Sequence, residues 1–434
     1  MSDRHPSDDA APEVDSPTLG QRARRGIGVL FGRQALVQLI TLGGGIALAR
    51  LLSPEEFAVF AICLYIQQTF GQLSNAGLVA ALIQQPTEPT DRERRVAFTM
   101  QLAALTVIAA IAVVVGPMLI DLYPSLSNEG YGSLFVVLVA ALWVGAFRSV
   151  PVVLLERQMR FVPLGGIELV EVFVHQAIAV GLAFAGWGVW ALAVAMLAKT
   201  IVGSVAAYLV SGWRPGLAWD TPTAVRLLSY GLPLQAKAIV LQASRGIPSI
   251  VIAPSIGVHA FGLLMWAQNV GTKLLFLFEP FRRVAFNHLC RTTQDAARSR
   301  VYGRYLGLVV TSIGVWAILV DGLGQSVLLA LYGQKWAGGL GAATLIAIAA
   351  TVNVAGRFAN LFLDAIGRPA KSLGVIIAET GLGYGAAAIL AAPLGILAGP
   401  IVWFLMSVFS TVLLSVLASR STLYQSCRSL LTYA

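Results

Sequence analysis

The chain has 434 residues, of which 57% are hydrophobic and 12% are charged, and its formal net charge is +9. Soluble domains carry about 25% charged residues, so a deficit spread along the whole sequence excludes an ordinary soluble domain and predicts a polytopic membrane protein. The cysteines Cys63, Cys290 and Cys427 are far apart and have no zinc or redox spacing, so we expect no disulfide, no metal and no cofactor.

The chain begins with a polar segment and continues in apolar ones. Residues 1–24 contain no apolar stretch, and we expect them to form a disordered cytoplasmic tail and not a signal peptide. Apolar stretches long enough to cross a bilayer then recur about twelve times. The expected spans are 27–51, 56–83, 96–121, 131–155, 164–185, 187–210, 226–252, 257–281, 302–330, 340–364, 371–392 and 395–418.

These spans predict an all-α polytopic membrane protein with two six-helix lobes around a central cavity. Two equal halves are usual in carriers that rock around a central site. We place the N-terminal lobe at 25–212 and the C-terminal lobe at 226–419. A cytoplasmic linker, 213–225, joins the lobes, and a cytoplasmic tail, 420–434, follows the second.

The basic residues of the loops predict the orientation of the chain. If the N-terminus is cytoplasmic, arginines such as Arg92, Arg94 and Arg95 gather in the inner loops, and the outer loops hold little beyond Lys335. Cytoplasmic loops of multi-pass proteins carry an excess of Lys and Arg. We therefore expect a bacterial inner-membrane protein with both termini in the cytoplasm.

Several cations fall inside the apolar spans, where a charge costs about 2.5–3.5 kcal/mol on insertion scales unless it faces a wet cavity or a partner. Few acids accompany them, so we predict a cavity that binds a bulky anion. Lys237 and Arg245 lie eight residues apart, just over two helical turns, and therefore share one face. The other candidates are Arg33, Arg148, Lys273 and Arg357, while Lys199 is set apart because its face is otherwise small and apolar. For Arg33 and Arg148, snorkelling to the cytoplasmic interface is the alternative.

Acids within the spans are candidates for coupling or for charge balance, namely Glu168, Glu171, Asp321 and Glu379. Glu168 and Glu171 are three residues apart on one helix face. They would bind a coupling cation or proton, mark an interfacial helix start, or pair with Arg157 and Arg160. Asp321 and Glu379 lie deeper in their spans and would neutralise buried cations.

Motifs of enzymes and of ATP-driven machines are missing from the sequence. It has no Gly-rich phosphate loop followed by Lys and Ser or Thr, no nucleophile elbow and no His–Glu metal motif. We therefore predict a carrier and not an enzyme.

Short stretches in both halves resemble the polysaccharide transporter family of Wzx-type flippases, in particular its colanic-acid-exporter-like members. This family belongs to the multidrug/oligosaccharidyl-lipid/polysaccharide exporter superfamily. The stretches are ARLLSPEEF at 49–57, NAGLVAALIQ at 75–84, LERQMRF at 155–161, GWGVWAL at 186–192, YGLP at 230–233, YGQKWA at 332–337 and GRP at 367–369.

The resemblance implies a V of two six-helix lobes that opens alternately to each side of the membrane. It also implies a polyprenyl-pyrophosphate-linked oligosaccharide as cargo, for exopolysaccharide, O-antigen or capsule biosynthesis. The implied partners are that lipid-linked oligosaccharide, membrane lipid and a polysaccharide polymerase or export complex, with no nucleic acid. A pyrophosphate needs compensating charge at membrane depth, which Lys and Arg supply.

Rival interpretations remain at this point. A cation-coupled multidrug exporter of the same superfamily would need an acid in the first lobe to bind a proton or sodium ion, and the first span offers Arg33 instead. A membrane enzyme that builds the sugar lipid would need a catalytic constellation, and a scaffold protein would leave the intramembrane cations without a role.

Overall fold

The computed structural model describes residues 19–74, 77–84, 88–121, 123, 131–273, 307, 310–312, 314–319, 321–322, 324–365 and 369–432. All regular secondary structure in these residues is helical. Seven of the described helices are long and apolar enough to cross a membrane, and three bent helix pairs raise this number to ten. The predicted all-α multi-pass architecture is confirmed, while the count of twelve spans stays a prediction.

The N-terminal lobe contains the first eight helices. They are α1 (Leu19–Leu51), α2 (Pro54–Ser74), α3 (Leu78–Gln84), α4 (Asp91–Ile120), α5 (Tyr131–Ala146), α6 (Ser149–Arg157), α7 (Phe161–Phe184) and α8 (Trp190–Ser211). Helix α4 begins with a capping box, because the Thr90 hydroxyl accepts from the Glu93 amide and the Glu93 carboxylate accepts from the Thr90 amide. Gly186 and Gly188 have φ of +82° and +53°, which permits the tight turn between α7 and α8.

The C-terminal lobe begins at α9 and ends with the longest helix. Its elements are α9 (Thr221–Arg245), the π-helix η1 (Ile247–Ile252), α10 (Ala253–Ile256), α11 (Val258–Gly271), α14 (Gly324–Tyr332), η3 (Gln334–Gly339), α15 (Leu340–Ala365), α16 (Pro369–Leu394), η4 (Gly395–Leu397) and α17 (Ala398–Thr432). Asp220 caps α9 by accepting from the Thr223 amide at 3.1 Å, and Pro222 occupies the first turn, where its missing N–H has no helical partner.

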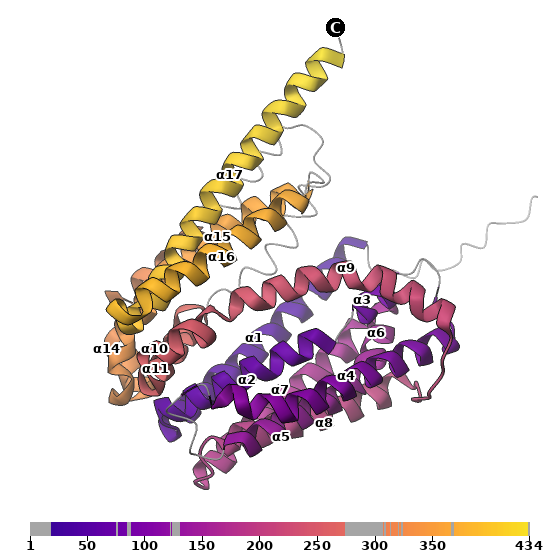
Figure 1. Ribbon diagram of the computed structural model, residues 1–434, viewed down its shortest axis with the longest axis horizontal. Helices are drawn as coiled ribbons and strands as arrows, with labels where there is room; N and C mark the ends of the chain where they lie inside the picture. The colour runs from indigo at the N-terminus through magenta and orange to yellow at the C-terminus, as the bar shows by residue number, and fades with distance from the viewer. Residues whose placement is uncertain are drawn as a thin grey trace, which may run out of the picture.

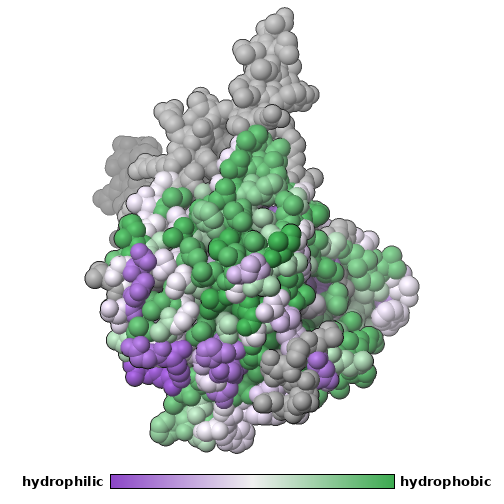
Figure 2. All heavy atoms as spheres, turned by 60° about the vertical axis from the view of Figure 1, so that its left-hand side comes forward, coloured by the Kyte–Doolittle hydropathy of each residue, from purple (hydrophilic) through white to green (hydrophobic). Residues whose placement is uncertain are grey.

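The two lobes meet along α9 and at a joined end formed by α11, α14 and η3. Figure 1 shows α9 running along the α1–α8 bundle, while α15, α16 and α17 diverge from it. Large apolar side chains remain exposed on both lobes, as at Phe184 (82%), Leu209 (79%) and Ile389 (74%). Such side chains cover most of the described surface in view in Figure 2, with hydrophilic ones gathered toward one end. An apolar outer surface of this kind suits lipid contact.

The joined end is held by three side chains that we call the lobe latch: Arg50, Lys335 and Trp336. Arg50 Nε donates to the Leu331 carbonyl at 2.7 Å, and Lys335 Nζ donates to the carbonyls of Arg50 and Leu52 at 2.9 and 2.7 Å. Trp336 is fully buried and its Nε1 donates to the Ala49 carbonyl at 2.9 Å. The latch therefore ties the α1–α2 corner to α14 and η3.

Several expected spans, among them the three below, are not the single helices that hydropathy predicts. The span 56–83 ends at Ser74 and resumes as α3, because Gly77 has a φ of +68°. The span 131–155 bends by 43° between α5 and α6, and the span 226–252 bends by 41° between the end of α9 and η1. Hydropathy does not register such breaks, since both sides of each break are apolar.

Candidate functional site

The structure sorts the sequence-predicted charges into two groups, one in each lobe. In the N-terminal lobe, Arg33 on α1 forms an ion pair with Glu168 on α7, with Nη1 and Oε2 3.2 Å apart. Arg148, at the break between α5 and α6, pairs with Glu171 on the same helix α7. Lys199 on α8 lies within electrostatic reach of Glu171. These cations therefore meet carboxylates across helix interfaces.

Glycines make room for this N-terminal group. A Cβ on Gly165 would lie 2.5 Å from Arg33 Cδ, and a Cβ on Gly203 would collide with the Glu171 carboxylate. The suggested pairing of the two acids with Arg157 and Arg160 stays a prediction. Arg157 Nη1 donates to the carbonyls of Leu82 and Ile83 and Arg160 Nη1 to that of Val210, which lie near the ends of α3 and α8.

The second group lies in a cavity of about 850 Å³ inside the C-terminal lobe. Its walls come from α9, η1, α11, α15, α16 and α17, and Arg245, Arg357 and Glu379 are among its lining residues. Arg357 Nε donates to Asn353 Oδ1 at 2.8 Å, and Glu379 lies within electrostatic reach of the Arg357 charge. Two arginines thus share the cavity with one carboxylate.

Arg245 differs from the other cations of this cavity. It is exposed to the cavity at the last residue of α9, and it forms no ion pair with any residue that the structure describes. Apolar residues also line the cavity, among them Ile252, Leu264 and Val402, and Trp403 adds an aromatic side chain. The cavity therefore combines a net positive charge with an apolar surface, which suits an amphiphilic anion.

The remaining candidates lie elsewhere. Lys237 belongs to α9, but its side chain lies outside the described residues. Lys273 directly follows α11 and does not line the cavity, and Asp321 is exposed between the two halves of the bent pair 310–319 and 324–332. The predicted set thus separates into Arg245, Arg357 and Glu379 in one cavity and the paired charges of the N-terminal lobe.

Sequence analysis missed several polar residues of the cavity, chiefly Asn353 and Asn360. Together with Arg357 they occupy positions i, i+4 and i+7 of α15, which places all three on one helix face. All three line the cavity, and the Asn360 Oδ1 is buried without a hydrogen-bond partner in the described part of the chain. The spacing of amides around an intramembrane arginine was the signal that would have found them.

Comparisons with known proteins agree with this geometry. The model of a family described as "Polysaccharide biosynthesis protein" matches residues 47–339. The chain belongs to this family. It is 25% identical over 298 residues to the "Succinoglycan biosynthesis transport protein ExoT" of Rhizobium meliloti (strain 1021), an alignment that covers 67% of this chain. The chain spans 58% of the length of that relative.

Solved structures place the fold of this polysaccharide biosynthesis protein among known transporters. The lipid II flippase MurJ in an inward closed conformation is similar with a TM-score of 0.73 at 12% identity, over 93% of this chain and 91% of that one. An inward-facing multidrug resistance MATE family transporter of the MOP superfamily is similar with a TM-score of 0.65 at 16% identity, over 90% and 94% of the two chains. These likenesses show that the chain shares its fold with solved transporters, which agrees with the expected carrier.

Proposed function

We propose that this protein moves a polyprenyl-pyrophosphate-linked oligosaccharide from the cytoplasmic to the outer face of the bacterial inner membrane. Family membership and the transport role in the name of the Rhizobium relative support a transported polysaccharide precursor. The observation that carries the proposal is Arg245, a cation with no ion-pair partner among the described residues, which lines a cavity with a second arginine.

The chemistry of the cavity matches the cargo in two respects. Arginine guanidinium groups bind phosphate oxygens in a bidentate fashion, and Arg245 and Arg357 would hold the pyrophosphate. The prenyl chain requires an apolar environment, which the Ile252, Leu264 and Val402 wall offers at the first isoprene units. Arg33 and Arg148 then have a structural role within the N-terminal lobe, where Glu168 and Glu171 balance their charges.

Transport would proceed by alternating access. The lobe latch lies at the end that the loop charges predict to be outside, which supports a starting state open to the cytoplasm. Unlatching would let the lobes rock and release the sugar outside. With a negative interior, outward movement of an anion is downhill by about 2.3 kcal/mol per charge per 100 mV.

The test is a deletion strain complemented with variants of this chain, in which polyprenyl-linked oligosaccharides are quantified by mass spectrometry. We expect the deletion to accumulate a finished repeat unit on the cytoplasmic face, wild type to clear it, and Arg245→Gln with Arg357→Gln to leave it in place. Arg214→Gln, in the exposed linker, is the matched control and should clear it.

Two results would contradict the proposal. Clearance by the Arg245→Gln, Arg357→Gln variant at the wild-type rate would remove the cavity from the mechanism. Unchanged lipid-linked pools in the deletion strain, together with altered sensitivity to cationic dyes, would instead favour the cation-coupled multidrug exporter.

A further inference from the structure

Helix α9 of the C-terminal lobe makes contacts with the N-terminal lobe along its length. Arg226 near its start pairs with Glu93, the Gln235 amide donates to the Gln72 carbonyl, and Gln242 Nε2 lies 3.5 Å from Thr69 Oγ1. Figure 1 shows the same helix lying along the N-terminal bundle. The α9 backbone is therefore fixed to the N-terminal lobe over most of its length.

At its end, α9 changes both its direction and its helix type. The chain bends by 41° at Gly246, and residues Ile247–Ile252 form the π-helix η1. On the side away from the N-terminal lobe, Arg245, Ile247 and Pro248 line the C-terminal cavity. The direction in which Arg245 enters the cavity thus depends on the geometry of this junction, and π-helical turns occur frequently at functional sites.

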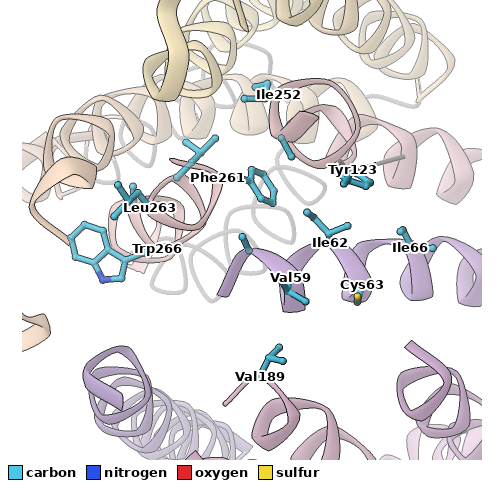
Figure 3. Close-up of a cluster of buried hydrophobic side chains, with 14 of the residues drawn as sticks. Val59, Ile62, Cys63, Ile66, Tyr123, Val189, Ile252, Phe261, Leu263 and Trp266 are labelled. Atoms are coloured by element: carbon cyan, nitrogen blue, oxygen red, sulfur yellow. The ribbon is translucent and has the colours of Figure 1, made fainter. Parts of the chain in front are cut away.

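Three tyrosines from three different elements surround the junction. The Tyr384 hydroxyl, from α16, donates to the Ala243 carbonyl at 2.7 Å, and the Tyr123 hydroxyl, from the segment after α4, donates to the Ser249 carbonyl at 2.7 Å. Tyr65, from α2, packs its hydroxyl against Gly246, where a Cβ would not fit. Figure 3 shows Tyr123 between α2 and the segment that carries Ile252.

The tyrosines meet on the backbone of the junction. The Tyr65 hydroxyl lies at Gly246, while the Tyr384 and Tyr123 hydroxyls donate to the carbonyls of Ala243 and Ser249. The three side chains thus bring α2 and the segment after α4, both of the N-terminal lobe, together with α16 of the C-terminal lobe around the end of α9.

The break in the helix explains why hydroxyls are placed here. In a continuous α-helix the Ala253 amide would donate to the Ser249 carbonyl, but in η1 it donates to Pro248 instead. The Tyr123 hydroxyl supplies the missing donor to this buried carbonyl. A buried carbonyl without a donor is costly, so the hydroxyl favours the bent π-helical form over a form in which this carbonyl has no donor.

We propose that Tyr65, Tyr123 and Tyr384 are positioning residues that hold the α9–η1 junction in the geometry in which Arg245 faces an anion in the C-terminal cavity. The inference rests on the proposed function, since the anion is the pyrophosphate of a prenyl carrier. The tyrosines do not touch the anion. They act through Arg245, and they make its position depend on the contact between the two lobes.

The experiment measures binding of farnesyl pyrophosphate to the purified full chain in nanodiscs by calorimetry. Tyr123→Phe with Tyr384→Phe removes two hydroxyls and keeps both rings, and we expect it to weaken binding about fivefold or more in the wild-type background. In an Arg245→Gln background the same pair of changes should alter binding less than about twofold, because the tyrosines act through Arg245. Tyr208→Phe is the control, since its buried hydroxyl has no hydrogen-bond partner among the described residues, and it should leave binding unchanged.

A second measurement does not depend on ligand. Hydrogen–deuterium exchange should show faster exchange of the amides of residues 246–253 in the double Phe variant than in wild type, and no such change in Arg245→Gln or Tyr208→Phe. Two results would overturn the positioning role of the tyrosines. One is an equal loss of binding in the wild-type and the Arg245→Gln backgrounds, and the other is unchanged amide exchange at the junction. If the wild-type protein does not bind farnesyl pyrophosphate while amide exchange changes as expected, the proposed anion site is wrong. The tyrosines would then hold the junction, but not for binding an anion.

Discussion

Replacing Trp336 by Phe should loosen the joined end of the two lobes without unfolding either lobe. The indole is fully buried, donates to the Ala49 carbonyl at 2.9 Å and packs against Phe57 and Trp266 with ring centroids 5.3 and 5.4 Å away. Phe keeps an aromatic ring but removes the N–H, and it leaves a carbonyl of a 1% exposed residue without that donor. We expect a loss of about 1–3 kcal/mol, which lowers the population of the latched state about 5- to 150-fold relative to the unlatched one.

Pulsed electron paramagnetic resonance measures this change directly. Spin labels at Trp187→Cys and Gly341→Cys, in a background without the native cysteines, report the distance across the joined end. Both label sites are exposed, and Gly188 beside the first packs against Glu56 at the start of α2. Trp336→Phe should shift the distance distribution toward longer values.

The matched control is Trp213→Phe, because Trp213 is also buried but contacts only Phe98 and Tyr208 of its own lobe among the described aromatic residues. It should lower the melting temperature and leave the inter-lobe distance unchanged. An unchanged distance distribution in Trp336→Phe would refute the assignment of the latch, whatever its effect on the melting temperature.

Two further predictions concern local packing and capping. Gly203→Ala should destabilise the protein by about 1–3 kcal/mol in thermal unfolding, because its Cβ would displace the Glu171 carboxylate from Arg148. Gly181→Ala is the control, since nothing lies within 4 Å of its Cβ, and it should be neutral or stabilising. Equal effects of the two substitutions would contradict the close packing at Gly203. Hydrogen bonds from Thr223, and then the charges of Arg92 and Arg226, hold the pKa of Asp220 below its ordinary value. A lowered pKa contributes stability that is present above the ordinary pKa of about 3.9 and is lost as pH falls through the folded-state pKa. Asp220→Asn retains the cap but not the charge, so its deficit in melting temperature relative to wild type should shrink below about pH 4, and a deficit independent of pH would contradict this linkage.

Much of the architecture could be predicted from sequence because bilayer thickness and backbone hydrogen bonding constrain membrane helices strongly. The membrane fold and the family follow from hydropathy and short stretches such as 49–57, and the start of α9 follows from Asp220 and Pro222. The breaks at Gly77 and Gly246 did not follow, since hydropathy averages over them. A π-helix gives no periodic signal within six residues.

The candidate site could be predicted only in part, for a different reason. An intramembrane cation indicates a partner or a cavity, but hydropathy does not say which one it has. Arg33 and Arg245 look alike in sequence, yet the first meets Glu168 on a neighbouring helix and the second faces the cavity. That difference depends on how α1 packs against α7 and on where α9 bends, and both are features of the tertiary structure.

The lobe latch has a consequence for how this protein can vary. Arg50, Lys335 and Trp336 all donate to main-chain carbonyls of the opposite lobe and not to side chains. The accepting positions Ala49, Leu52 and Leu331 are therefore free to change their side chains with respect to these bonds, while the donors are not. Reciprocal substitution, which repairs a broken ion pair, has no counterpart here, because no residue on the other side can be exchanged to restore a lost donor. Among related sequences, the side chains at the accepting positions should therefore vary more than those of the three donors.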